Sequence, residues 1–206
     1  MPSLVGSEMC IRDRDDVTAF LFDGVSLHFE PGAETYVQFT ETRANGSVVM
    51  VDPNIRPSFV SNEPLFRDHM ERMFRLADIV KVSDEDLNWF LPESESTETK
   101  VAKLQKLGPA LVILTCGDSD VRAWKPEGNP IFVDKLKVDV VDTVGAGDSF
   151  NAGFLTNLAE SGLLKKAAIR VISESDIVAA LNFGVRTAAV TVGRAGANPP
   201  WRNELE

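Results

Sequence analysis

Cysteine and histidine are scarce in this 206-residue chain, which contains two of each. Cys10 and Cys116 are too few for a disulfide framework, so the reducing cytoplasm is the expected compartment. His28 and His69 belong to no Cys/His cluster, which argues against a structural zinc site. The composition therefore predicts neither a disulfide-stabilised secreted domain nor a zinc-stabilised one.

Positive charge and long apolar runs are also in short supply. The chain has 21 Lys and Arg against 31 Asp and Glu, a net charge of −10. This balance argues against partners such as nucleic acid or an anionic membrane surface. No apolar run is long enough for a transmembrane helix. What is present, 44% hydrophobic and 25% charged residues, is typical of one ordinary globular domain with a sizeable core.

Apolar runs typical of buried strands alternate with helical periodicities along the chain. The strand-like runs are residues 19–22, 47–51, 78–82 and 111–114, followed by a hairpin of 121–124 and 130–133. The helical stretches are residues 33–43, 64–77, a short one after Ser83, 97–107 and about 174–190. This alternation predicts an α/β fold with a mostly parallel sheet and helices on both faces.

Residues 138–155 combine the features of an anion site. Val138 to Val141 predicts the end of a strand, and the apolar spacing over residues 150–158 predicts a helix. Between them, Gly145 and Gly147 let backbone N–H groups approach a phosphate without an intervening Cβ. The dipole and the unpaired first N–H groups of the helix add attraction for negative charge.

Asp148 lies where a carboxylate would repel a phosphate. One interpretation is helix capping, for which Asp is well suited. The other is a base that accepts the proton of a hydroxyl as it attacks the phosphate. The short pattern Gly-Ala-Gly-Asp leaves both open. It is not a Walker P-loop, because Gly-x-x-x-x-Gly-Lys-Ser/Thr is absent, and it lacks the three spaced glycines of a dinucleotide fingerprint.

The longer run from Asp142 to Leu155, DTVGAGDSFNAGFL, closely resembles the second signature of the ribokinase/PfkB family of sugar kinases. The resemblance implies a ribokinase-like fold and transfer of the ATP γ-phosphoryl group to a sugar hydroxyl, with Asp148 as the base. Backbone N–H groups of Gly145, Ala146 and Gly147 would stabilise the transferring group as an oxyanion hole does. ATP and Mg²⁺ are the cofactors that it implies.

The segment 52–57, Asp-Pro-Asn-Ile-Arg-Pro, follows a predicted strand, and ligands in open α/β sheets bind beyond such strand ends. By residue type alone a turn is the better interpretation, because Asp, Pro and Asn favour turns. The segment also resembles the Asp-Pro-Asn-x-Arg element of fructokinase-like family members. That resemblance implies that Asn54 and Arg56 lie near the phosphates or the sugar.

The resemblance extends to the nucleotide and to metal ions. It implies that Lys81, Thr115 and Gly117 bind the nucleotide. Asp86 stands where the family usually has Glu near the Mg²⁺ waters, and water-mediated contact would tolerate the shorter side chain. The alternative for this stretch is capping of a helix by Ser83.

A monovalent cation, K⁺ among the candidates, is also implied at Asp142 and Val144, beside carbonyls of the closing segment 194–197. Besides Asp86, two further positions depart from the family pattern: Asp120 replaces a Gly of the nucleotide site, and Val185 replaces a frequent Asn.

These segments together point most closely to bacterial fructokinases. A 2-keto-3-deoxygluconate kinase shares most of the motifs, and a non-catalytic nucleotide-binding protein of the same fold is the alternative that the departures support. The expected partners are ATP and a small sugar, with a homodimer in the full-length protein.

Residues 4–14 have neither helical nor strand periodicity, and they match one translated frame of a transposon-based sequencing adapter. We expect residues 1–14 to be a non-native segment. Residues 15–206 would then be the C-terminal, nucleotide-binding part of a ribokinase-like kinase domain, lacking the N-terminal portion that carries the lid and much of the sugar pocket. Such a fragment is expected to be a poor enzyme.

Overall fold

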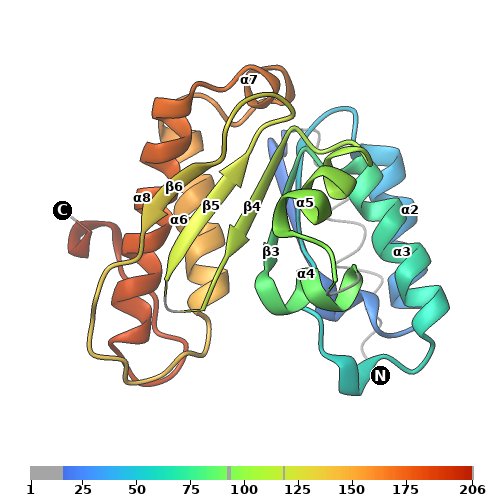
Figure 1. Ribbon diagram of the computed structural model, residues 1–206, viewed down its shortest axis with the longest axis horizontal. Coiled ribbons are helices and arrows are strands. Elements are labelled where there is room, and N and C mark those ends of the chain that lie inside the picture. Colours follow the sequence, from blue (N-terminus) through green and yellow to red (C-terminus); the bar gives the residue numbers. More distant parts are fainter. Residues whose placement is uncertain (1–15, 92–93, 118, 206) are drawn as a thin grey trace.

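The computed structural model describes residues 16–91, 94–117 and 119–205, so the expectation for residues 1–14 lies outside the described residues. Its centre is one six-stranded sheet with the strands in sequence order (Figure 1). The strands are β1 Ala19–Asp23, β2 Val48–Asp52, β3 Ile79–Ser83, β4 Leu111–Thr115, β5 Asp120–Trp124 and β6 Ile131–Asp134. β1 to β4 run parallel, and β5 and β6 add an antiparallel hairpin. The predicted mostly parallel sheet and hairpin are confirmed.

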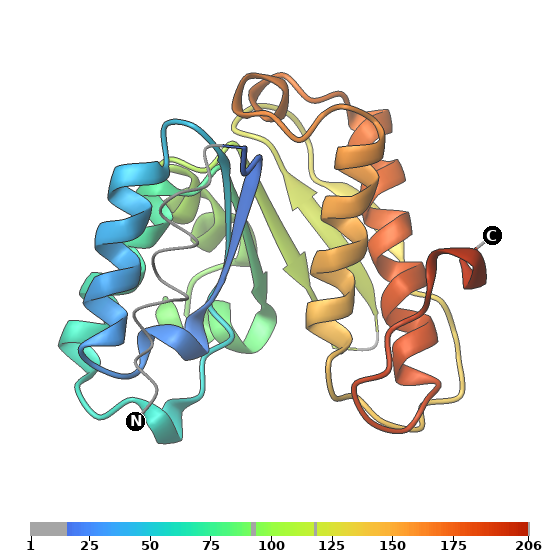
Figure 2. The ribbon, with the colours of Figure 1, turned by 180° about the vertical axis from the view of Figure 1, so that it is seen from behind.

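Helices cover both faces of this sheet (Figures 1 and 2). The first group is α2 Gly32–Arg43, α3 Glu63–Leu76, α4 Asp84–Phe90 and α5 Thr97–Gln105. The second group is α6 Ala146–Glu160, α7 Lys166–Arg170 and α8 Glu174–Val192. Three short 3₁₀ helices are η1 Gly24–Leu27, η2 Pro57–Phe59 and η3 Arg202–Glu204. No helix in the described ranges combines the length and the apolarity needed to cross a membrane.

The two groups of helices lie on opposite faces because of the handedness of the connections between strands. Parallel strands are joined by right-handed crossovers, and each crossover from β1 to β4 moves the chain one strand in the same direction. The connecting helices therefore lie on the same face. Side-chain alternation then gives two cores: Val49 and Val51 pack with α2 to α5, whereas Val48 and Met50 pack with α6 to α8.

The predicted strand end at Val138 to Val141 is wrong. These residues form no strand, and Val140 and Val141 are 62% and 61% exposed. The N–H groups of Val141 and Asp142 instead donate to the carbonyl of Val192, at 2.8 and 3.2 Å. The last carbonyls of a helix have no partner within it. The carbonyl at the end of α8 therefore accepts the N–H groups that a neighbouring strand would otherwise have bonded.

Candidate active site

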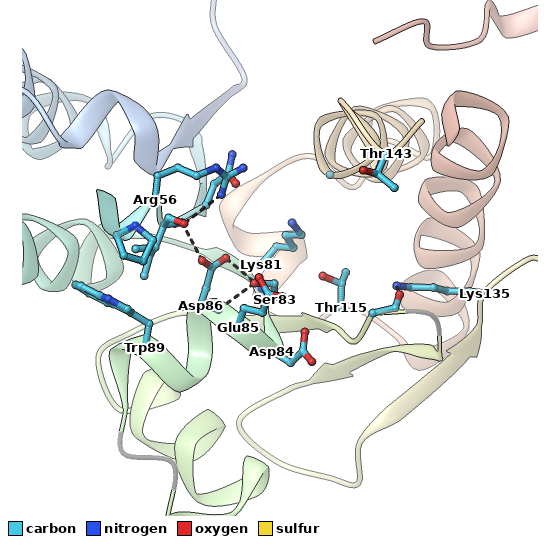
Figure 3. A pocket seen from close by; sticks show the side chains of 15 residues that line it. Arg56, Lys81, Ser83, Asp84, Glu85, Asp86, Trp89, Thr115, Lys135 and Thr143 are labelled. Atoms are coloured by element: carbon cyan, nitrogen blue, oxygen red, sulfur yellow. Dashed lines mark hydrogen bonds between the residues drawn. The ribbon is translucent and has the colours of Figure 1, made fainter. Parts of the chain in front are cut away.

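Each parallel strand ends in a polar residue, and the four ends meet at one edge of the sheet. Asp23 of β1 is in register with Asp52 of β2, and Ser83 of β3 is in register with Thr115 of β4. A cavity of about 480 Å³ opens at this edge (Figure 3). Seven of the residues implied by the sequence line it: Asn54, Arg56, Lys81, Asp86, Thr115, Gly117 and Gly147. The carboxyl edge of the sheet is thus where the fold gathers the predicted nucleotide and phosphate residues.

The segment after β2 is held in shape by two carboxylates. Asn54 adopts a left-handed backbone, φ +40°, which Asn tolerates better than most residues. Its Nδ2 donates to Asp23 Oδ2 at 2.8 Å. The next amide, Ile55 N–H, donates to Asp86 Oδ1 at 2.8 Å. Arg56 is exposed and lines the cavity, so its guanidinium group can reach a ligand.

The first turn of α6 lies beside the ammonium group of Lys81. Gly145 precedes the helix with φ +77°, a conformation that glycine adopts readily. A Cβ on Gly147 would lie 3.4 Å from Lys81 Nζ, which is van der Waals contact, so the ammonium lies directly beside this turn. The N–H of Ala146 donates to the carbonyl of Thr143 at 3.3 Å. The helix dipole and Lys81 therefore place positive charge at the same point of the cavity wall.

Asp148 lies in that first turn and is exposed, outside the set of residues that line the cavity. Loss of water contact, together with the negative charges of Asp23 and Asp52, raises the pKa of its carboxyl above the usual range. Lys81 and Arg56 act in the opposite direction. An acid at a site of mixed charge with a raised pKa is suited to accept a proton.

Asp86 has a structural role that accounts for both of its carboxylate oxygens. Its N–H donates to Ser83 Oγ at 3.0 Å, and Ser83 N–H approaches Asp86 Oδ2 at 3.5 Å, which completes a capping box at the start of α4. The other oxygen accepts the N–H of Ile55. Capping by Ser83 is confirmed. The lone pairs that remain on Asp86 fit water-mediated contact with Mg²⁺ better than direct ligation, because Mg²⁺ keeps several waters.

Three carboxylates line one side of the cavity: Asp84, Glu85 and Asp86. Within the described ranges, no group of three or more His, Cys, Asp or Glu side chains is arranged to hold a metal ion. A magnesium ion bound here would have to take further oxygens from water and from nucleotide phosphates, as Mg²⁺ commonly does.

The opposite wall of the cavity comes from the turn after β4 and the end of β6. Lys135 donates to the carbonyl of Cys116 at 3.2 Å and to that of Gly117. Asp120, one of the departures from the family pattern, accepts from Arg122 Nε at 2.8 Å. Arg122 lowers the pKa of Asp120, so this carboxylate is ionised and already neutralised. Its charge is therefore no obstacle to a phosphate chain nearby.

The residues expected at a monovalent cation lie together beyond the cavity. Asp142 accepts the N–H groups of Val144 and Gly196 at 3.0 and 2.9 Å, and both bonds lower the pKa of its carboxyl. The turn before α6 is thus tied to the closing segment. Val185, another of these departures, is 6% exposed and packs in the core with α6.

Sequence reasoning assigned no role to Asp52, Asn151, Lys135 or Thr143. Lys135 and Thr143 line the cavity. Asp52 Oδ2 accepts from Lys81 Nζ at 2.9 Å and from Asn151 Nδ2 at 2.8 Å. Asp52 and Asn151 both belong to motifs that the sequence singled out, but only the fold shows that they meet.

The profile of the pfkB family carbohydrate kinases matches residues 15–204. The chain therefore belongs to the pfkB family of carbohydrate kinases. A fructokinase of Rhizobium leguminosarum bv. trifolii is 37% identical over 160 residues, which are 78% of this chain and 48% of that protein. A fructokinase of Klebsiella pneumoniae is 30% identical over 184 residues, 88% of this chain and 58% of that protein. The chain spans about half the length of these curated relatives.

Solved structures show the same fold. The structure of fructokinase with bound ATP from Xylella fastidiosa has a TM-score of 0.80 at 25% identity, over 89% of this chain and 57% of that one. Aminoimidazole riboside kinase from Salmonella enterica, complexed with aminoimidazole riboside and an ATP analog, has a TM-score of 0.79 at 25% identity. That match covers 94% of this chain and 64% of the other. The predicted ribokinase-like fold is confirmed.

Proposed function

We propose that this chain forms the nucleotide-binding part of an ATP-dependent sugar kinase, with fructose as the sugar. The observation that carries the proposal is the position of Asp148, which has a raised pKa, in the first turn of α6 beside Lys81 and Arg56. Two matched relatives are named fructokinase, which favours fructose over 2-keto-3-deoxygluconate. The other substrate is ATP, and the expected setting is the cytoplasm, with a homodimer for the longer protein.

In the proposed reaction, Asp148 accepts the proton of the sugar hydroxyl while that oxygen forms its bond to the γ-phosphorus. The bond from this phosphorus to the bridging oxygen breaks, and ADP leaves. Negative charge builds up on the transferring group, and the N–H groups of Gly145 and Gly147 would stabilise it with the α6 dipole. The N–H of Ala146 would join them on leaving the carbonyl of Thr143. Arg56 and Lys81 add positive charge from two sides of the cavity.

Two ions belong to this proposal. Mg²⁺, held through water by Asp86, would neutralise charge on the nucleotide phosphates. K⁺ is proposed at Asp142, Val144 and the carbonyls of the closing segment. The K⁺ site is supported by the hydrogen bond that Gly196 N–H donates to Asp142, because this bond joins the turn before α6 to the closing segment.

Asp148→Asn tests the proposal directly. We expect ATP affinity within about two-fold of wild type, since the carboxylate does not bind ATP, and a loss of turnover of about 10²-fold or more, as for removal of a general base. Calorimetric titration with ATP measures the affinity, and a coupled assay of ADP release with fructose, run on the full-length protein with the same substitution, measures turnover. Asp176→Asn, in the first turn of α8, is the matched control and should change neither.

Equal losses of affinity and turnover in Asp148→Asn would contradict the role of a base. A full-length protein that binds ATP but releases no ADP with fructose would favour the non-catalytic alternative.

A further inference from the structure

Three polar side chains from three elements meet under the cavity wall, and they are nearly fully buried. Asp52 ends β2, Lys81 lies on β3 and Asn151 lies on α6, with exposed fractions of 2%, 6% and 1%. Lys81 Nζ donates to Asp52 Oδ2 at 2.9 Å, and Asn151 Nδ2 donates to the same oxygen at 2.8 Å. The carboxylate is thus held between an ammonium group and an amide.

This network is costly as a purely structural feature. Burial of charged and amide groups has a desolvation cost that a well-packed apolar cluster would avoid. Asp52 Oδ1 and Asn151 Oδ1 are buried and have no hydrogen-bond partner among the described residues, so the network is not fully satisfied. An arrangement of this kind calls for a role that apolar residues could not fill.

The position of the network indicates the role. Lys81 lines the cavity, and its Nζ lies beside Gly147 at the start of α6. An ammonium group on a flexible four-carbon side chain is a poorly directed phosphate ligand unless something fixes it. Asp52 accepts from Lys81 on the buried side, and Asn151 donates to Asp52, so the remaining N–H groups of Lys81 are left for the cavity.

We propose that Asp52 and Asn151 are positioning residues that hold the Lys81 ammonium at the N-terminus of α6, where it binds the phosphate chain of the nucleotide. This inference rests on the proposed function, since it requires a phosphate ligand in the cavity. Asn151 fixes the carboxylate from α6, and the carboxylate fixes the ammonium. The bond from α6 therefore couples the helix that carries Asp148 to the cation on β3.

The test compares ATP, ADP and adenosine in calorimetric titrations of the same chain. We expect Lys81→Met to weaken ATP and ADP binding about ten-fold or more, as for loss of a charged hydrogen bond, with adenosine affinity unchanged. Asp52→Ala should show the same selectivity, and Asn151→Ala a smaller effect of the same kind. Asp52→Asn keeps an oxygen that can accept from Lys81 and should restore part of the affinity.

The double variant Asp52→Ala/Lys81→Met separates positioning from an independent effect. If Asp52 acts only through Lys81, the double variant binds ATP no more weakly than Lys81→Met alone. Lys166→Met is the matched control, because Lys166 also pairs with a buried aspartate, Asp78. It should lower thermal stability without changing ATP affinity.

Additive losses in the double variant would overturn the positioning role, as would equal weakening of ATP and adenosine binding in Asp52→Asn. A wild-type chain that binds neither ATP nor ADP would instead overturn the proposed function, and the inference with it. Thermal unfolding of each variant identifies any that fail to fold, and Asp52→Asn remains the informative substitution if Asp52→Ala is one of them.

Discussion

Asp148, the proposed base, lowers the stability of the fold when its carboxyl is ionised. Partial loss of water around its carboxyl, together with the charges of Asp23 and Asp52, raises its pKa above the ordinary 3.8. The folded state therefore binds this proton more tightly than the unfolded state does. Stability is greatest when Asp148 is protonated and falls as the pH rises through its folded pKa.

We expect Asp148→Asn to raise the thermal unfolding midpoint at pH 7, because the amide cannot ionise. The gain should shrink as the pH falls through the raised pKa of Asp148. Asp142→Asn should act in the opposite direction, since Val144 and Gly196 lower the pKa of Asp142 and its ionised form stabilises the fold above pH of about 4. Thermal melts of both variants from pH 4 to pH 8 measure the two trends, and a lower midpoint for Asp148→Asn at pH 7 would contradict the first.

At the scale of elements, α6 and α8 pack closely because glycines face the contact. A Cβ on Gly153 would lie 2.4 Å from Thr187 Oγ1 and 3.1 Å from Gly184 Cα. A Cβ on Gly184 would lie 2.9 Å from the ring of Phe150. Since α6 carries Asp148 and Asn151, this contact also fixes where the helix holds them beside the cavity.

We expect Gly153→Ala to destabilise the fold by about 1–3 kcal/mol, as overpacking of a tight contact does. The unfolding midpoint should fall by about 2–4 °C for each kcal/mol in a chain of this size. Gly32→Ala is the control, because a Cβ there meets no atom within 4 Å. It should be neutral or slightly stabilising. Thermal unfolding checks both, and a Gly153→Ala variant as stable as Gly32→Ala would show that the contact can relax.

For the molecule as a whole, the sheet has β1 at one end and β6 at the other. Leu21 on β1 is 42% exposed, whereas its neighbours Phe20 and Phe22 contact Phe39 of α2. Leu21 therefore faces away from α2, on the face of the sheet where its register partner Met50 packs. An end strand with an exposed apolar residue favours association between sheet edges.

We expect the chain to self-associate as its concentration rises, and Leu21→Lys to reduce this association, because a charged residue on an end strand opposes edge pairing. Val171→Lys is the control: Val171 is 81% exposed but lies after α7 and outside the sheet. Sedimentation velocity over a range of concentrations measures the effect. Equal association of wild type and Leu21→Lys would show that another surface is responsible.

Local sequence determined most of the elements and predicted the family and the candidate site. Apolar periodicity and caps such as Ser83 act over a few residues, so strands and helices could be predicted from the chain. The run from Asp142 to Leu155 predicted the family. The same local reasoning failed at Val138 to Val141, where the backbone bonds to the end of α8 instead of to a strand.

Only the tertiary structure decided which polar residues meet. Asp52 and Asn151 are 99 residues apart, and no periodicity relates them. They come together because parallel strands end at one edge and α6 packs its first turns against that edge. Asp120 likewise departs from the family pattern in sequence, and only its pairing with Arg122 shows that the charge is neutralised. Local spacing specifies elements, whereas partners for buried charges depend on contacts that the folded chain alone creates.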